Sequence, residues 1–184
     1  MTMKLKFDPN LKYQDDAIES VVGLFKGQSR RQSHFTLSQY TQMSGTLFTE
    51  QGIGNKLELS REDIEKNLQQ IQLKNGLPQS ESLSELDFDI EMETGTGKTY
   101  VYLKSILRLN EEYGFTKFII VVPSLAIKEG VYKTLQITES HFKESFNNII
   151  YDYFVYDSKK LNLIQSFAQA DHISIMVINI DAFR

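Results

Sequence analysis

The feature that most constrains the fold is the octapeptide METGTGKT at residues 92–99. Its two glycines permit backbone angles that turn consecutive N–H groups toward one point, and a helix that begins directly afterwards adds its positive end. Alternating apolar and acidic residues at 86–92 predict a half-exposed strand before the octapeptide, with only its last residues deeply buried. A strand, a glycine-rich loop and a helix in this order predict a phosphate-binding loop.

The loop predicts binding of a nucleoside triphosphate with magnesium. We expect Lys98 to reach the β- and γ-phosphates and the Thr99 hydroxyl to bind Mg²⁺, which makes these two the predicted catalytic residues. An ordinary turn before a helix is the alternative, but a chance match to this pattern is expected in well under about one chain in a hundred of this length. The predicted nucleotide-binding residues of the loop are Glu93, Thr94, Gly95, Thr96, Gly97, Lys98 and Thr99.

Three further apolar runs predict the strands of a parallel sheet. Strands that alternate with helices build β–α–β units, so we expect an α/β fold. Runs such as FIIVV and IMVINI are apolar at nearly every position, which favours strands covered on both faces. The expected strands are 118–122, 149–155 and 173–180, and the expected helices are 98–113, 125–135 and 159–168.

The N-terminal half predicts two helices around a polar insertion. Residues 14–25 place apolar side chains on one helical face, and this helix is expected to end near Gly27. Ser60 is expected to cap a second helix, and Asp63 at the third helical position is expected to complete a capping box with it. Between them, residues 28–54 are rich in Ser, Gln and Thr and have no sustained apolar period, so we expect an insertion that is either ordered but irregular or mobile.

Composition excludes several classes of function. No apolar run approaches the roughly 18–20 residues that span a bilayer, which argues against a membrane role. The sequence has no cysteine, so disulfides and thiolate metal sites are excluded and a cytoplasmic location is expected. The formal net charge of -4 repels nucleic acid, so DNA binding requires a local surface. The three histidines are scattered and predict no metal site.

Three segments together resemble the restriction (Res) subunit of type III restriction-modification enzymes, which are relatives of superfamily-2 helicases. They are LKYQDDAIESVVGLF, FDIEMETGTGKTYVYL and FIIVVPSLAIKEGVYKTL. Methionine at position 92, where the general pattern has its first glycine, is typical of helicases rather than of small-molecule kinases. The resemblance implies a partial RecA-like parallel sheet with flanking helices, a P-loop NTPase. The implied regions are 1–27 with the first helix, 28–85 as a polar insertion with one helix, and 86–184 as the first part of the ATPase domain.

The resemblance also implies roles for residues outside the loop. Gln14, after Tyr13, matches the glutamine that hydrogen-bonds the adenine edge and thereby selects ATP; the alternative is a polar residue at the start of an exposed helix. Pro123 and Ser124 match the motif that contacts the DNA backbone, with Lys128 assisting. A plain strand-to-helix turn is the alternative for these residues.

The implied function is the ATP-driven translocase or helicase motor of a type III restriction endonuclease. With a methyltransferase (Mod) subunit that reads the sequence, such an enzyme cleaves double-stranded DNA. Hydrolysis requires an Asp-Glu pair after a further strand, but Ala182 follows Asp181. We read Asp181 as lying upstream of that pair; the alternative is that Asp181 itself holds Mg²⁺.

The chain is expected to be part of a longer subunit and to lack hydrolytic activity by itself, because the sequence has no second motor domain, arginine finger or nuclease motif. Three other functions stay open. They are another superfamily-2 DNA helicase, a P-loop kinase of small molecules, and a nucleotide-binding module without turnover.

Overall fold

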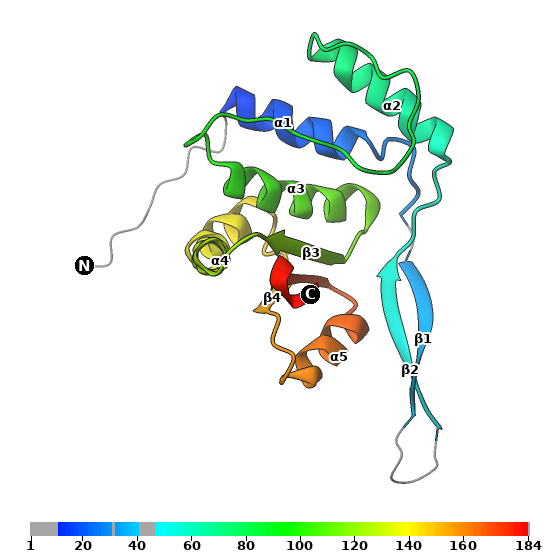
Figure 1. The fold of residues 1–184 in the computed structure, drawn as a ribbon, viewed down its shortest axis with the longest axis vertical. Coiled ribbons are helices and arrows are strands. Elements are labelled where there is room, and N and C mark those ends of the chain that lie inside the picture. The colour runs from blue at the N-terminus through cyan, green and yellow to red at the C-terminus, as the bar shows by residue number, and fades with distance from the viewer. Residues whose placement is uncertain (1–10, 31, 41–46, 184) are drawn as a thin grey trace, which may run out of the picture. The chain divides into compact units, whose positions relative to one another are not determined.

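The structure, a computed structural model, describes residues 11–30, 32–40 and 47–183 (Figure 1). The chain forms two compact units, each assembled from two separate stretches. The first unit comprises Met1–Ser29 and Leu57–Tyr113, and the second comprises Arg30–Lys56 and Gly114–Arg184. The domain boundaries expected from the sequence, after residues 27 and 85, stay predictions.

The first unit is built from α1 (Lys12–Gly23), α2 (Arg61–Lys74) and α3 (Lys98–Tyr113). All three helices are confirmed at nearly the predicted bounds. Helices α1 and α3 pack against each other, and the Tyr113 hydroxyl donates to the Val22 carbonyl at 3.1 Å. The apolar core of this unit includes Ile18, Val22, Ile64, Leu103 and Leu107, each 2% exposed.

Helix α2 begins with the predicted capping pair. The Ser60 hydroxyl accepts from the Asp63 amide at 3.1 Å, while the Ser60 amide donates to the Asp63 carboxylate at 3.3 Å. The two side chains thus satisfy two backbone donors that the helix itself leaves without partners.

Replacing Ser60 with alanine is expected to lower the free energy of unfolding by about 1 kcal/mol, because the helix loses its N-cap acceptor. Urea denaturation followed by circular dichroism measures this change. Ser82→Ala is the matched control, since Ser82 is exposed and makes no hydrogen bond within the described residues. Equal stability of the two variants would contradict the capping role.

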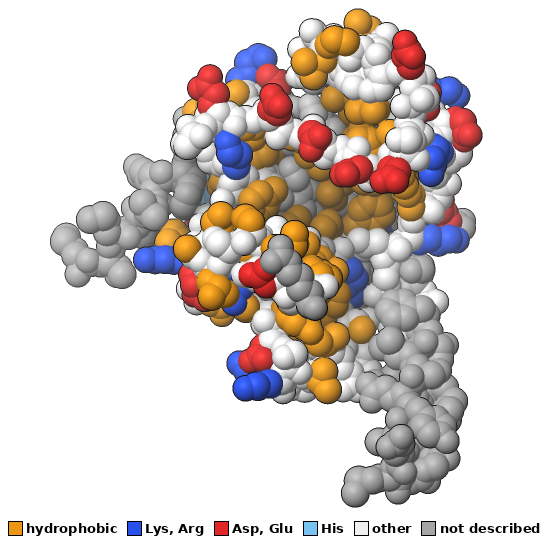
Figure 2. All heavy atoms as spheres, in the orientation of Figure 1, with side chains coloured by type: hydrophobic (Ala, Val, Ile, Leu, Met, Phe, Trp, Pro, Cys, Tyr) orange, Lys and Arg blue, Asp and Glu red, His pale blue; other side chains and the backbone are white. Residues whose placement is uncertain are grey.

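The predicted strand at 86–92 is wrong. After a bend at residues 84–86, residues 87–93 run as an extended segment without a ladder (Figure 1), and no strand of the described residues pairs with it. Leu86 and Ile90 are 49% and 43% exposed. Acidic side chains gather over this segment in Figure 2. Alternation of apolar and acidic residues describes an extended chain equally well with or without a neighbouring strand, so the pattern could not decide the pairing.

The second unit contains a parallel sheet of β3 (Lys117–Val122), β4 (Tyr151–Val155) and β5 (Ile173–Asn179), in the order β3-β5-β4. Helices α4 (Leu125–Ser145) and α5 (Leu161–Gln169) flank this sheet, and η1 (Ile180–Phe183) follows β5. The predicted α/β fold is therefore confirmed as a partial RecA-like parallel sheet. Helix α4 extends ten residues beyond the expected end, because Thr138 and Phe142 continue the buried face of Val131 and Leu135.

The expectation that the strands are covered on both faces is confirmed for β5 and wrong for β3. Residues 173–178 of β5 are all buried. In β3, Ile119 and Val121 are 54% and 49% exposed. Strand β5 lies between two neighbours, whereas β3 is at an edge of the sheet of described residues, so its apolar run does not guarantee two covered faces.

A β-hairpin replaces the expected irregular segment. Strands β1 (Gln32–Tyr40) and β2 (Leu47–Asn55) pair antiparallel, from Gln32 opposite Asn55 to Tyr40 opposite Leu47. Residues 41–46, also within the expected irregular segment, lie outside the described residues. The expectation is wrong for these strands, because antiparallel pairing rests on backbone hydrogen bonds that a Ser-, Thr- and Gln-rich sequence also permits.

Asn55 joins this hairpin to the start of β3. Its side-chain oxygen accepts from the amides of Thr116 and Lys117 at 2.8 and 3.0 Å, and its side-chain nitrogen donates to the Lys117 carbonyl at 2.7 Å. A single asparagine in a polar stretch gives no sequence signal for such a contact.

In the described ranges, no helix has both the length and the apolar content required to cross a bilayer.

Candidate nucleotide-binding site

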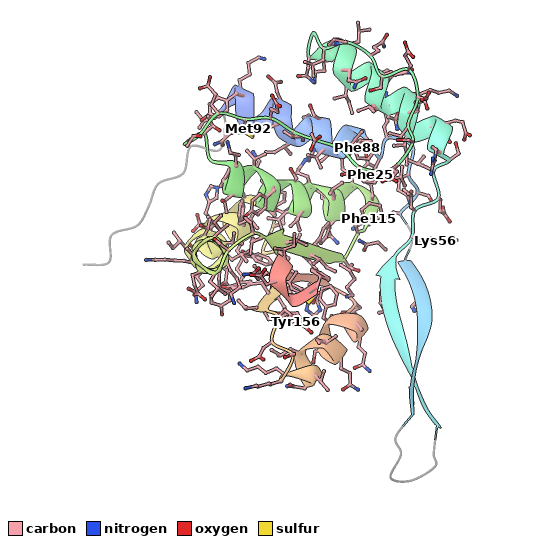
Figure 3. All side chains as sticks on the ribbon, in the orientation of Figure 1. Phe25, Lys56, Phe88, Met92, Phe115 and Tyr156 are labelled. Atoms are coloured by element: carbon pink, nitrogen blue, oxygen red, sulfur yellow. The ribbon has the colours of Figure 1, made fainter. Side chains whose placement is uncertain are left out.

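The loop between residue 93 and α3 has the backbone conformation that its glycines predict. Gly95 and Gly97 have φ angles of +82° and +86°, in the left-handed region that favours glycine. Helix α3 begins directly afterwards, at Lys98. Figure 3 labels Met92 where the extended segment reaches the loop. The predicted loop and helix are therefore present, although the preceding strand is not.

Most amides of the loop are open. The Thr96 amide and hydroxyl both contact the Glu93 carbonyl, at 3.4 and 2.6 Å, which closes a turn. The amides of Gly95, Gly97, Lys98 and Thr99 have no acceptor among the described residues. Several backbone donors therefore stay available at the positive end of α3, the arrangement that an anion requires.

Lys98 crosses back over the loop. Its ammonium group donates to the Glu93 carbonyl at 2.9 Å and also to the Met92 carbonyl. Neutral carbonyl oxygens are weaker partners for an ammonium group than charged phosphate oxygens are. The ammonium group is thus held beside the open amides by contacts that a phosphate can replace favourably.

Thr99 lies in the first turn of α3 and is half-buried. Burial raises the pKa of the neighbouring Tyr102 hydroxyl, and the Thr99 side chain partly offsets this rise. The hydroxyl oxygen of Thr99 carries two lone pairs, so it could also serve as a metal ligand of the kind predicted.

Gln14 contacts the loop from α1. It is only 7% exposed, and its side-chain nitrogen donates to the Thr96 carbonyl at 2.8 Å. A Cβ added to Gly97 would lie 2.7 Å from that nitrogen, so position 97 has space for glycine alone while the contact is kept. Gln14 is thus a buried partner of the loop, whereas its predicted contact with adenine stays a prediction.

A comparison with protein families decides what kind of chain this is. The sequence model of the family described as "Type III restriction enzyme, res subunit" matches residues 8–184. The chain belongs to this family.

Curated Res subunits are similar to this chain. The chain is 30% identical to the EcoPI Res subunit of Escherichia phage P1 and 28% identical to the EcoP15I Res subunit of Escherichia coli, each over 97% of the chain and 19% of the relative. It is 45% identical to the StyLTI Res subunit of Salmonella typhimurium over 64 residues, which cover 34% of the chain and 6% of the relative. The chain thus spans 19% of the length of the first two relatives.

Membership in the Res family confirms the resemblance that the three sequence segments carry. The parallel three-stranded sheet with flanking helices is consistent with the RecA-like fold of this family. A helicase-like domain of this kind implies nucleotide binding. The individual site residues stay predictions, because no comparison tests them one by one.

The predicted DNA-contacting residues of this Res-family chain lie at the start of α4, in the second unit. Ser124 is the N-cap of α4, and its hydroxyl accepts from the Ile127 amide at 3.3 Å. Pro123 is exposed and Lys128 is half-buried. The hydroxyl thus caps a helix at a strand-to-helix turn, and the DNA role stays a prediction.

Asp181 lies in η1 after the buried strand β5. It is exposed, and its amide donates to the side-chain oxygen of Asn179 at 2.9 Å. Ala182 follows it in the same short helix. This geometry leaves both predicted readings of Asp181 in place.

Proposed function

We propose that this chain is the ATP-binding part of the DNA translocase motor of a type III restriction enzyme Res subunit. The observation that carries the proposal is the loop at residues 93–99, where four open amides and the Lys98 ammonium group lie at the start of α3. These groups suit the phosphates of a nucleotide in number and charge. Family membership supports the same assignment.

Each residue of the loop has a defined task in this proposal. The amides of Gly95, Gly97, Lys98 and Thr99 donate to phosphate oxygens, and Lys98 exchanges its two carbonyl contacts for the β- and γ-phosphates. The Thr99 hydroxyl binds Mg²⁺. ATP, when bound with Mg²⁺, supplies the phosphoanhydride bond whose hydrolysis drives the motor.

Gln14 links nucleotide identity to the loop. Its side-chain nitrogen holds the Thr96 carbonyl, and its side-chain oxygen makes no hydrogen bond within the described residues. In our proposal the amide also bonds the adenine edge, so that recognition of the base and the shape of the loop depend on one side chain. A buried amide that serves two partners favours ATP over other nucleotides.

The wider activity follows from the same proposal. Amides at the start of α4, with Pro123, Ser124 and Lys128, contact the backbone of double-stranded DNA without reading its bases. A methyltransferase (Mod) partner supplies the sequence recognition, and the complete enzyme cleaves DNA in the cytoplasm. Asp181 lies upstream of the acidic pair that hydrolysis requires, so this chain by itself binds ATP without DNA-stimulated hydrolysis.

The test is nucleotide binding measured by titration calorimetry in the presence of Mg²⁺. We expect binding of ATP in preference to GTP, and we expect Gln14→Ala to reduce the ATP-to-GTP affinity ratio about fivefold, the effect of about one lost hydrogen bond. Gln165→Ala in α5 is a control with the same side-chain change. Absence of nucleotide binding would remove the proposed function, whereas an unchanged ratio in Gln14→Ala would remove only the adenine role.

A further inference from the structure

An apolar groove lies in the first unit, between α1, α2 and the extended segment that leads to the loop, and one end of it is lined by residues 93–96 of the loop itself. Its volume is about 1350 Å³, far more than a nucleobase fills. Apolar side chains from all three elements line it, including Val21, Leu68, Ile71, Phe88, Ile90 and Met92. The apolar residues of the alternating pattern at 86–92 therefore line this groove instead of packing in a sheet.

The acidic residues of the same pattern lie at the edge of the groove. Asp89, Glu91 and Glu93 are exposed, and none of the three forms an ion pair within the described residues. Residues 81–93 carry six carboxylates and no lysine or arginine. In Figure 2 the acidic side chains form a row where Figure 1 draws this segment crossing α1. An apolar groove thus has a strongly negative edge.

The backbone of the segment is held only at its ends. Before it, Arg61 donates to the Ser84 carbonyl at 2.5 Å and Glu65 accepts from the Leu83 amide at 3.0 Å. After it, Lys98 holds the Met92 carbonyl. Between them, the backbone of residues 86–91 makes no hydrogen bond within the described structure. An extended chain with open N–H and C=O groups is a template for another strand.

Charge determines which occupant suits this groove. The open amides of the loop lie only at one end of the groove, whereas its edge at Asp89 and Glu91 carries unpaired carboxylates, which repel phosphates. A polypeptide strand with alternating apolar and basic residues matches every feature. Its backbone pairs with residues 86–91, its apolar side chains enter the groove, and its lysines or arginines face Asp89 and Glu91.

We propose that the groove binds an extended, basic segment of a partner polypeptide by strand addition beside residues 86–91. Because Met92 and Glu93 connect this segment to the loop, partner binding and the loop share one stretch of backbone. This inference goes beyond the nucleotide site and does not require it. The groove variants described below leave every predicted loop residue in place.

The test uses a fluorescein-labelled peptide of alternating valine and lysine, whose binding to this chain is followed by fluorescence anisotropy. Two matched peptides carry glutamate in place of lysine or serine in place of valine. We expect each to bind at least about tenfold more weakly, because one loses the charge match and the other the apolar contacts. Equal binding of the three peptides would overturn the proposal.

Variants of the chain locate the binding surface. Asp89→Asn combined with Glu91→Gln is expected to weaken binding of the valine–lysine peptide about fivefold, as two exposed charge pairs are lost. Ile90→Ser is expected to weaken it through the apolar contact. The controls are Glu129→Gln with Glu144→Gln in α4, and Leu73→Ser on the exposed side of α2. Equal losses in the controls, or no hydrogen-exchange protection of amides 86–91 on binding, would overturn the proposal.

Discussion

Replacing Lys98 with alanine is expected to weaken ATP binding by this chain about thirtyfold, equivalent to about 2 kcal/mol. The reason is the place of the ammonium group, which the contacts with the Met92 and Glu93 carbonyls hold beside the open amides of the loop. Hydrogen bonds to a charged phosphate are about twice as strong as those between neutral groups, so this donor contributes more than any single amide. Titration calorimetry with Mg²⁺ and ATP measures the change.

Lys66→Ala is the matched control for this prediction. Lys66 is exposed on α2 and lies outside the loop, so its loss removes the same charge from the first unit without touching the candidate site. Binding by the Lys66 variant is expected to equal that of the unmodified chain. Lys98 is itself exposed, so its replacement should leave the thermal unfolding of the chain nearly unchanged. Undiminished ATP binding by Lys98→Ala would remove the loop from the nucleotide site.

The sequence predicted the loop, its helix and the parallel sheet because each depends on local or periodic features. Gly95 and Gly97 require left-handed angles, which few other residues adopt. The apolar run of β5 predicts a buried strand, and the Ser60–Asp63 pair predicts a helix start within one turn. Each of these signals lies within a few residues of the structure that it predicts.

The features that the sequence did not predict depend on distant contacts. The hairpin pairs residues up to 23 positions apart, its attachment through Asn55 joins residues 61 and 62 apart, and the Gln14 contact with Thr96 joins residues 82 apart. The segment at 86–92 has the alternation of a strand, yet strand formation also requires a neighbour, and no alternation within one segment reveals it. In all three cases the sequence does not reveal which separate segments lie next to each other in the fold.

Replacing Gly97 with alanine is expected to lower the free energy of unfolding by about 2–3 kcal/mol and to weaken ATP binding as well. A left-handed φ angle costs a residue with a side chain about 1–2 kcal/mol. The added Cβ would also lie 2.7 Å from the Gln14 nitrogen, so the buried amide must move and lose its bond to the Thr96 carbonyl. That loss adds about 1 kcal/mol. Urea denaturation and titration calorimetry measure the two effects.

Gly95→Ala separates the two causes. Gly95 has nearly the same φ angle, but a Cβ at this position meets nothing within 4 Å, so this variant carries the backbone strain alone. We expect it to be more stable than Gly97→Ala by about 1 kcal/mol. In a double-mutant cycle, Gln14→Ala should cost less stability beside Gly97→Ala than in the unmodified chain, because the bond to Thr96 is already lost. Strictly additive costs would show that Gln14 does not hold the loop through Thr96.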